Sequence, residues 1–206
     1  MARAPWAIPN KESGNGNDTV SWSASEHTGR EARQTQATFA ASGVSPSPVL
    51  TIIQSGKSEF VSFDSATAAV DKTGGTLTIT GKSNSSKLTF ALTGTNGIGL
   101  TLPTKYKANS VDTNNGTAIA GDPGAAQEYV FSITFTGINE NTSISELVSQ
   151  LTVTPNSGSS AAVTCTITQA AGDAYLTISP NTITIPAAGT PAQSVAVSSN
   201  TNWTIS

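Results

Sequence analysis

Apolar and polar residues alternate along most of this chain with the period of two that a half-buried strand requires. Val20 and Trp22, for example, alternate with serines, and residues 129–135 and 163–169 repeat the pattern. Gly, Asn, Ser and Pro clusters separate these runs. The pattern predicts an all-β protein in which each strand buries one face.

The final segment, residues 174–206, contains three strand-like runs, at residues 175–180, 194–200 and 202–206. Three short alternating strands bury their apolar face only where further strands cover it. We therefore interpret this segment as the N-terminal half of a β-sandwich.

The first segment, residues 1–55, has the strand pattern of the other half of such a sandwich. It contains four strand-like runs, which begin at Trp6, Thr19, Ala37 and Leu50 and are separated by turn-forming clusters. We interpret it as the C-terminal half of the same kind of sandwich.

An internal repeat relates the ends of the chain to its middle. An offset of 115 residues aligns Gln54 with Gln169, Phe60 with Tyr175, Val70 with Ile185, Gly74 with Gly189, Leu88 with Trp203 and Phe90 with Ile205. Self-similarity at a fixed spacing indicates repeated structural units. Residues 57–171 are therefore predicted to form one complete sandwich.

Two segments of this middle unit are predicted to be additions to the basic sandwich. Residues 105–127 are rich in Asn, Gly and Asp, which predicts a long loop. Residues 142–151 begin with Thr and Ser and carry apolar residues at Ile144, Leu147, Val148 and Leu151, a spacing that predicts one short helix.

We expect the half-domains of different molecules to complete each other and to give a head-to-tail homo-oligomer. The middle domain is expected to separate its neighbours by on the order of 30 Å, whereas each linker, at residues 55–58 and 170–174, spans only about 15 Å. The residues expected to form the composite core and subunit interface are Trp203, Ile205, Val195, Val197, Tyr175, Ile178, Trp6, Ile8, Val20, Trp22 and Ile53.

The low charge of the chain narrows the choice of partners. Only 11% of the residues are charged and the net charge is -3, which provides no basic surface for nucleic acid or anionic lipid. The N-terminus lacks the apolar stretch of a signal peptide, and no window has the ~18 apolar residues of a membrane helix. We expect no nucleic-acid or membrane partner, and synthesis in a cytoplasm without a signal peptide of the chain's own.

Few residues are candidates for catalysis or metal binding. His27, the only histidine, lies in a turn, where a solvated role is more typical than a catalytic one. Cys165 alternates with apolar residues, as a small buried core residue does. Asp112 and Asp122 offer oxygens to Ca²⁺ but lack the full ligand spacing and a late bidentate Glu. We predict no enzyme, no metal and no cofactor.

The aromatic residues raise the question of glycan binding. Trp22 and Trp203 are in phase with the apolar positions of their strands, which favours packing over sugar stacking. Tyr106, within residues 105–127, is the candidate exposed aromatic for a glycan contact.

Joined end to start, the chain carries a recognisable series of motifs. The order is Asn202-Trp-Thr-Ile-Ser, Trp6-Ala-Ile-Pro, Ser13-Gly-Asn-Gly-Asn, Val20-Ser-Trp-Ser, Arg33 and Gln54. This order resembles BACON domains, the Ig-like β-sandwiches of Bacteroidetes proteins and of phages that infect these bacteria. The likeness covers both terminal segments and part of the middle, where Leu88 and Leu100 take the tryptophan positions.

The resemblance implies tandem Ig-like sandwiches, a core position for Trp6, and an extracellular or virion setting. Carbohydrate binding has been proposed for the family, and no catalytic residues come with it. The expected function is therefore that of a self-assembling structural protein of a phage virion, as a capsid decoration, fibre or tail component. Its partners are expected to be copies of itself and other virion proteins.

Two alternatives stand beside this expectation. The first is an adhesin module of a virion or bacterial cell surface that binds host or mucin glycans. The second is an excerpt from a longer tandem-repeat surface protein, which the intact mass of the natural protein would distinguish.

Overall fold

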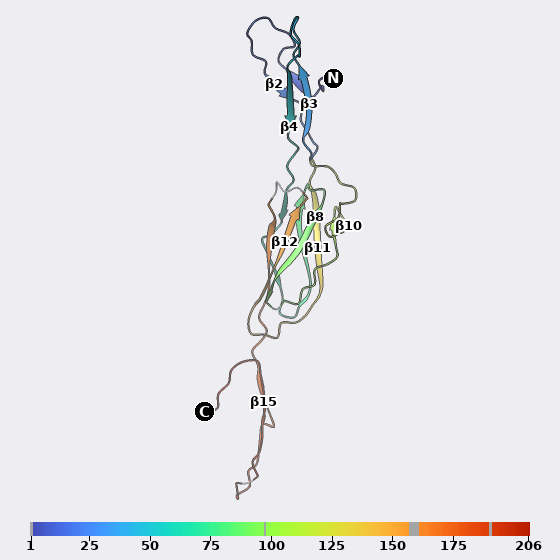
Figure 1. Ribbon diagram of the computed structural model, residues 1–206. Coiled ribbons are helices and arrows are strands. Elements are labelled where there is room, and N and C mark those ends of the chain that lie inside the picture. Colours follow the sequence, from blue (N-terminus) through green and yellow to red (C-terminus); the bar gives the residue numbers. More distant parts are fainter. Residues whose placement is uncertain (1, 97, 157–160, 190) are drawn as a thin grey trace.

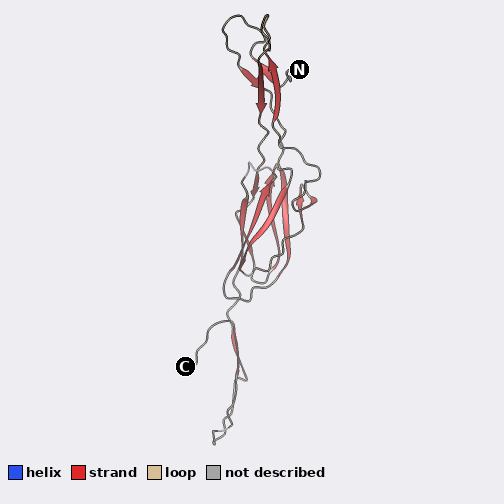
Figure 2. Cartoon of the chain, viewed as in Figure 1, coloured by secondary structure: helices blue, strands red, loops and turns tan. Residues whose placement is uncertain are grey.

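The computed structural model describes residues 2–96, 98–156, 161–189 and 191–206. Every regular element in these ranges is a β-strand (Figure 2). The prediction of an all-β protein is therefore confirmed. None of the described residues belongs to a helix that is long and apolar enough to cross a bilayer.

The middle of the chain folds into two sheets, which we call the central sandwich (Figure 1). One sheet has the order β10-β9-β11-β7-β5, with β5 at Val61–Phe63, β7 at Gly75–Ser83, β9 at Lys105–Ala108, β10 at Val111–Asn114 and β11 at Tyr129–Ile138. The other has the order β6-β13-β12-β8, with β6 at Thr67–Val70, β8 at Leu88–Asn96, β12 at Leu147–Pro155 and β13 at Val163–Gln169. All neighbouring strands are antiparallel except β6 and β13, which are parallel.

Aromatic rings fill the space between the two sheets. Phe131 is fully buried and lies edge to face against Phe63 at 5.8 Å and Phe90 at 5.6 Å, the arrangement that ring quadrupoles favour. Cys165 is fully buried in the same core, as its alternation predicts. Burial raises the pKa of its thiol, so the group stays protonated at neutral pH.

The helix predicted at residues 142–151 is wrong, because β12 occupies Leu147–Pro155. Ser149 and Leu151 are buried whereas Val148 is exposed, so the segment alternates with the period of a strand. Pairing with β8 on one side and β13 on the other satisfies both edges of its backbone. A helix here would leave β8 and β13 without the strand that lies between them. Pairing with these strands therefore overrides the local helical spacing.

Residues 105–127 were expected to form a loop, but they begin with the β9–β10 hairpin, which extends the five-stranded sheet. Asn115 then binds the open edge of β8, accepting a hydrogen bond from the main-chain N–H of Phe90 at 2.7 Å and donating to its carbonyl at 2.9 Å. The insert therefore covers an edge strand that is otherwise free to pair with another chain.

The expectation that Tyr106 is an exposed aromatic is also wrong. Its side chain is 2% exposed, and its ring lies 4.9 Å from that of Phe90 in the core. Tyr106 alternates with the exposed residues of β9, so the new strand points it inward. It offers no surface on which a sugar can stack.

The two terminal segments form isolated two-stranded pairs at opposite ends of the central sandwich (Figure 1). In the N-terminal segment, β1 (Ala7–Pro9) pairs with β2 (Trp22–Ala24), and β3 (Arg33–Thr38) pairs with β4 (Val49–Gln54). In the C-terminal segment, β14 (Leu176–Ser179) pairs with β15 (Ala196–Ser199). The strands predicted at residues 6, 19, 37 and 50 correspond to β1 to β4, although β3 begins earlier.

The third run predicted in the C-terminal segment, residues 202–206, is not a strand in this chain. Ile205 within it is 87% exposed. A strand needs a partner for its main-chain groups, and no described strand pairs with this run.

Gly81→Ala should destabilise the central sandwich. A Cβ at this position overlaps the carbonyl oxygen of Ser62 and the ring of Phe131. We expect a loss of about 1–3 kcal/mol or more in the free energy of unfolding, measured in urea. Gly99→Ala is the control, because the atom nearest to its Cβ is Nδ2 of Asn139 at 3.8 Å. Equal losses for both variants would contradict the described core.

Candidate assembly interface

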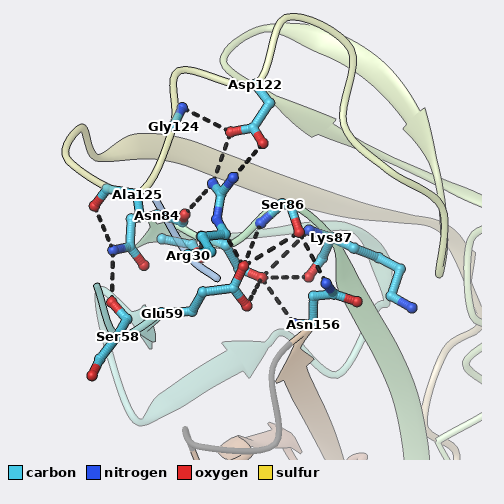
Figure 3. Close-up of polar contacts among 12 residues, drawn as sticks. Arg30, Ser58, Glu59, Asn84, Ser86, Lys87, Asp122, Gly124, Ala125 and Asn156 are labelled. Carbon is cyan, nitrogen blue, oxygen red and sulfur yellow. Dashed lines mark hydrogen bonds and ion pairs between the residues drawn. The ribbon is translucent and has the colours of Figure 1, made fainter. Parts of the chain in front are cut away.

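A partly buried charge network joins the N-terminal segment to the central sandwich (Figure 3). Arg30 donates from Nη1 to Oδ2 of Asp122 at 2.6 Å, and its Nε lies 2.8 Å from Oε1 of Glu59. Its Nη2 donates to the main-chain carbonyl of Asn84 at 2.6 Å. Because one guanidinium serves two carboxylates and a carbonyl, it fixes the loop of the N-terminal segment against the sandwich.

The two linkers are held by equivalent main-chain hydrogen bonds. At the first, the N–H of Lys57 donates to the carbonyl of Gly29 at 2.8 Å. At the second, the N–H of Gly172 donates to the carbonyl of Ser143 at 2.7 Å. Each linker is therefore attached to the loop of the unit that precedes it, which limits the freedom of the segments to fold back.

The β14–β15 pair of the C-terminal segment repeats the polar contacts of the β5–β7 pair of the central sandwich. In the sandwich, Oδ1 of Asn84 accepts from the N–H of Phe60 at 2.7 Å. In the C-terminal segment, Oδ1 of Asn200 accepts from the N–H of Tyr175 at 2.9 Å. Phe60 and Tyr175 are the residues that the 115-residue offset aligns. The two asparagines therefore play the same local role.

The serines before these asparagines repeat each other in the same way. Ser83 Oγ donates to the carbonyl of Phe60 at 2.6 Å, and Ser199 Oγ donates to the carbonyl of Tyr175 at 3.0 Å. The residues match in chemistry and in geometry, so β14 and β15 have the local structure of β5 and the end of β7.

The apolar residues that follow these asparagines differ in burial between the central sandwich and the C-terminal segment. Leu88 and Phe90 of the central sandwich are 0% and 2% exposed, because the second half of the sandwich covers them. Trp203 and Ile205, at the aligned positions, are 46% and 87% exposed. The C-terminal segment therefore presents a core face that nothing covers in the described part of the chain.

The N-terminal segment corresponds instead to the second half of the central sandwich. Arg33 pairs with Gln54 across β3 and β4, as Leu147 pairs with Gln169 across β12 and β13. Both glutamines donate an amide hydrogen to a main-chain carbonyl, that of Ser25 at 2.9 Å for Gln54 and that of Asn139 at 2.8 Å for Gln169. The two hairpins therefore share their register and their terminal hydrogen bond.

The β3–β4 hairpin also has an apolar face that is exposed. By the shared register, Phe39 corresponds to Val153 and Leu50 to Cys165. The two sandwich residues are fully buried, whereas Phe39 is 45% exposed and Leu50 is exposed as well. An open hollow of about 750 Å³ lies beside the hairpin, and its lining includes Val20, Trp22, Ala37, Phe39, Ala41 and Val44.

Two arginines lie over the tryptophans of the N-terminal segment. The guanidinium of Arg33 lies 4.6 Å from the centre of the Trp6 ring, and that of Arg3 lies 5.6 Å from the Trp22 ring. Cation–π contacts of this kind cover one face of each ring. Both tryptophans remain partly exposed within a single chain.

The structure thus gathers the predicted interface residues into two sets that do not meet within one chain (Figure 1). The N-terminal set is Trp6, Ile8, Val20, Trp22 and Ile53, and the C-terminal set is Tyr175, Ile178, Val195, Val197, Trp203 and Ile205. None of these residues is fully buried in the described chain. The sequence interpretation missed Arg30, Asn84 and Asn200, although the repeated Ser-Asn pair at residues 83–84 and 199–200 was a usable signal.

The residues considered for metal binding and catalysis have polar partners in the structure. Asp112 forms an ion pair with Lys107 at 2.7 Å. A ring nitrogen of His27 lies 2.7 Å from the carbonyl of Glu31. Among the described residues, no group of three or more His, Cys, Asp and Glu side chains is arranged to hold a metal ion.

No known family model matches this sequence, and no curated protein is significantly similar to it. The likeness to BACON domains therefore rests on the residues quoted above and stays a resemblance.

The joint at Arg30 should loosen in acid. The Arg30 guanidinium holds the pKa of Asp122 below its usual value, so the contact is fully present above the free carboxyl pKa of about 3.9 and is lost as the pH falls through the lowered value. The protection of the Lys57 amide from hydrogen exchange, relative to its intrinsic rate at each pH, should therefore fall below about pH 4.

The variant Asp122→Asn should reduce this pH dependence. Asp112→Asn is the matched control, because Asp112 pairs with Lys107 on the surface, away from the joint. An unchanged pH profile in Asp122→Asn would contradict the role of this ion pair.

Proposed function

We propose that this protein is a structural, self-assembling component of a virion, linked head-to-tail by exchange of half-domains. The C-terminal segment of one molecule supplies the first half of a sandwich, and the N-terminal segment of the next supplies the second half. Each molecule contributes its central sandwich as a spacer between two such composite domains. The virion setting, as a phage capsid decoration, fibre or tail component, comes from the resemblance to BACON domains.

One observation carries the proposal: the same fold positions are covered in the central sandwich and uncovered in the two terminal segments. The C-terminal segment has the local structure of the first half and the N-terminal segment that of the second half. The C-terminal segment of one copy can therefore cover the apolar face of the N-terminal segment of another copy, as the two halves of the central sandwich cover each other. Burying each large apolar side chain contributes about 1.5–3 kcal/mol.

The position of the segments favours pairing between molecules. The central sandwich lies between them (Figure 1), and both linkers are tied by hydrogen bonds to neighbouring loops. Self-closure within one molecule requires these joints to break, whereas a second molecule meets no such obstacle. A head-to-tail contact of this kind extends into a filament, or closes into a ring if its rotation permits.

Trp203→Ala should weaken assembly while leaving the central sandwich folded. The aligned residue, Leu88, is fully buried in its own core, and truncating a buried aromatic costs about 3–5 kcal/mol. Light scattering should show smaller species, with the thermal transition of the sandwich unchanged. Val130→Ala removes an exposed apolar side chain of β11 and serves as the control.

Deletion of residues 174–206 extends this test. The truncated chain should be monomeric, and adding those residues back as a peptide should restore protection of the N-terminal segment from hydrogen exchange. A truncated chain that still assembles would contradict half-domain exchange.

Glycan binding is a second candidate function, favoured by the open hollow that Trp22 and Phe39 line together with the polar side chains of Lys11, Glu12 and Asp18. Aromatic faces beside a few polar groups suit neutral sugars. In the proposed assembly, however, the partner's strands fill this hollow.

We therefore expect weak or no glycan binding by the assembled protein on a glycan array. Trp203→Ala, which leaves the hollow open, is the informative comparison. Binding by the assembled protein that disappears in Trp22→Ala, with folding intact, would favour the glycan-binding function over assembly.

A further inference from the structure

We infer that the partner's C-terminal segment enters the N-terminal segment in one defined register, with Ile205 of one copy opposite Phe39 of the next. Residues 203–206 pair as an antiparallel strand with residues 38–41, at the end of β3, and residues 182–185 add to β4 as a parallel strand. This inference rests on the proposed function, because it specifies the pairing within the composite domain.

The antiparallel register follows from the pairing of β12 with β8. There Val153 lies opposite Phe90, and Pro155 lies opposite Leu88. In the N-terminal segment, Phe39 takes the place of Val153 and Ala41 that of Pro155, by the shared register of the two hairpins.

The C-terminal segment supplies the other side of each pair. By the 115-residue offset Ile205 takes the place of Phe90 and Trp203 that of Leu88, so the link from the Ser-Asn pair is one residue shorter than in the central sandwich. Phe39 therefore faces Ile205, and Ala41 faces Trp203.

The parallel register follows from the pairing of β13 with β6. Ile167 of β13 lies opposite Ala68 of β6. Ile52 takes the place of Ile167, and Ile183 takes the place of Ala68. Residues 182–185 therefore run beside β4 in the direction of that strand, with Ile183 opposite Ile52.

The shape of the N-terminal segment fits this arrangement. Ala37, Phe39 and Ala41 lie along the wall of the open hollow, on the side where the antiparallel strand enters. The small side chain of Ala41, opposite Trp203, leaves room for the indole ring, as alternating large and small residues do in sheet cores. The hollow therefore lies where the register requires space.

The backbone of the N-terminal segment offers the necessary edges. Among the described strands, β3 and β4 pair with each other alone, so the outer edge of each is open to a further strand. In the central sandwich the corresponding edges of β12 and β13 pair with β8 and β6. The partner's residues 182–185 pair along β4, and its residues 203–206 pair with residues 38–41 at the end of β3.

The apolar surface available is large enough for a stable contact. Six large apolar residues of the N-terminal segment and eight of the C-terminal segment are exposed by 37% to 87%. If about ten of them are buried at roughly 80–100 Å² each, they contribute about 800–1,000 Å², before the backbone is counted, which approaches the size of stable interfaces.

The register also assigns the two neighbouring isoleucines of β4 to different faces. Ile167, which corresponds to Ile52, is fully buried, whereas Thr168, which corresponds to Ile53, is partly exposed. Ile53 is itself 66% exposed. In the proposed register Ile52 therefore lies in the composite core, and Ile53, which the sequence predicts as a core residue, lies on the other face of β4.

Paired cysteines test the register in the full-length chain. One preparation carries Phe39→Cys and the other Ile205→Cys, and the two are mixed and oxidised mildly. Directly opposed residues in an antiparallel pair have Cα atoms about 4.5–5.5 Å apart, which suits a disulfide. We expect the mixture to give a covalent dimer on a non-reducing gel.

Ala41→Cys mixed with Ile205→Cys is the matched control, on the same face but shifted by two residues. Its Cα atoms are expected about 7–8 Å apart, beyond the reach of a disulfide, so we expect at least tenfold less dimer. Unsubstituted chains serve as the blank, because Cys165 is fully buried. Ile52→Cys with Ile183→Cys tests the parallel strand independently.

The outcomes separate the register from the function on which it rests. Strong crosslinking of the Phe39/Ile205 and Ile52/Ile183 pairs supports the register. Assembly that persists by light scattering, with crosslinking strongest for Ala41/Ile205 or absent from both designed pairs, overturns the register and leaves the assembly standing. An unsubstituted chain that is strictly monomeric overturns the proposed function itself.

Discussion

A β-sheet that is apolar on one face has to be covered by a second layer, and this constraint governs the whole chain. The central sandwich meets it internally, with Phe131 and Phe135 of one sheet fully buried against the other. The terminal segments form two-stranded pairs, and their large apolar side chains stay exposed in the described chain. Phe90 is 2% exposed, whereas Ile205, at the aligned position, is 87% exposed.

Polar contacts also join each terminal segment to the central sandwich. Arg30 binds the carboxylates of Glu59 and Asp122, and it fixes the N-terminal segment on the end of the central sandwich. At the other end, Asn200 donates to the carbonyl of Thr142, which belongs to the sandwich. These contacts tie each terminal segment to the central sandwich by polar groups as well as by the chain itself.

Local sequence patterns misled where tertiary pairing decided the outcome. Residues 142–151 have helical spacing, yet Leu147–Pro155 is a strand because β8 and β13 leave a place between them. Tyr106 lies in an Asn- and Gly-rich stretch that is typical of exposed loops, yet a hairpin in that stretch turns its ring into the core. In both cases the deciding contacts come from residues distant in the sequence, which no local window contains.

The sequence by itself determined that the chain is all-β, because alternation with period two is a local property of each strand. It also determined the 115-residue repeat that relates Phe90 to Ile205, because related units keep their core residues in the same order. Only the tertiary structure decided the Arg30 joint, the burial of Tyr106 and the strand registers. Ion pairs across 92 residues and cross-strand partners depend on how separate elements meet in space, and alternation alone leaves that open.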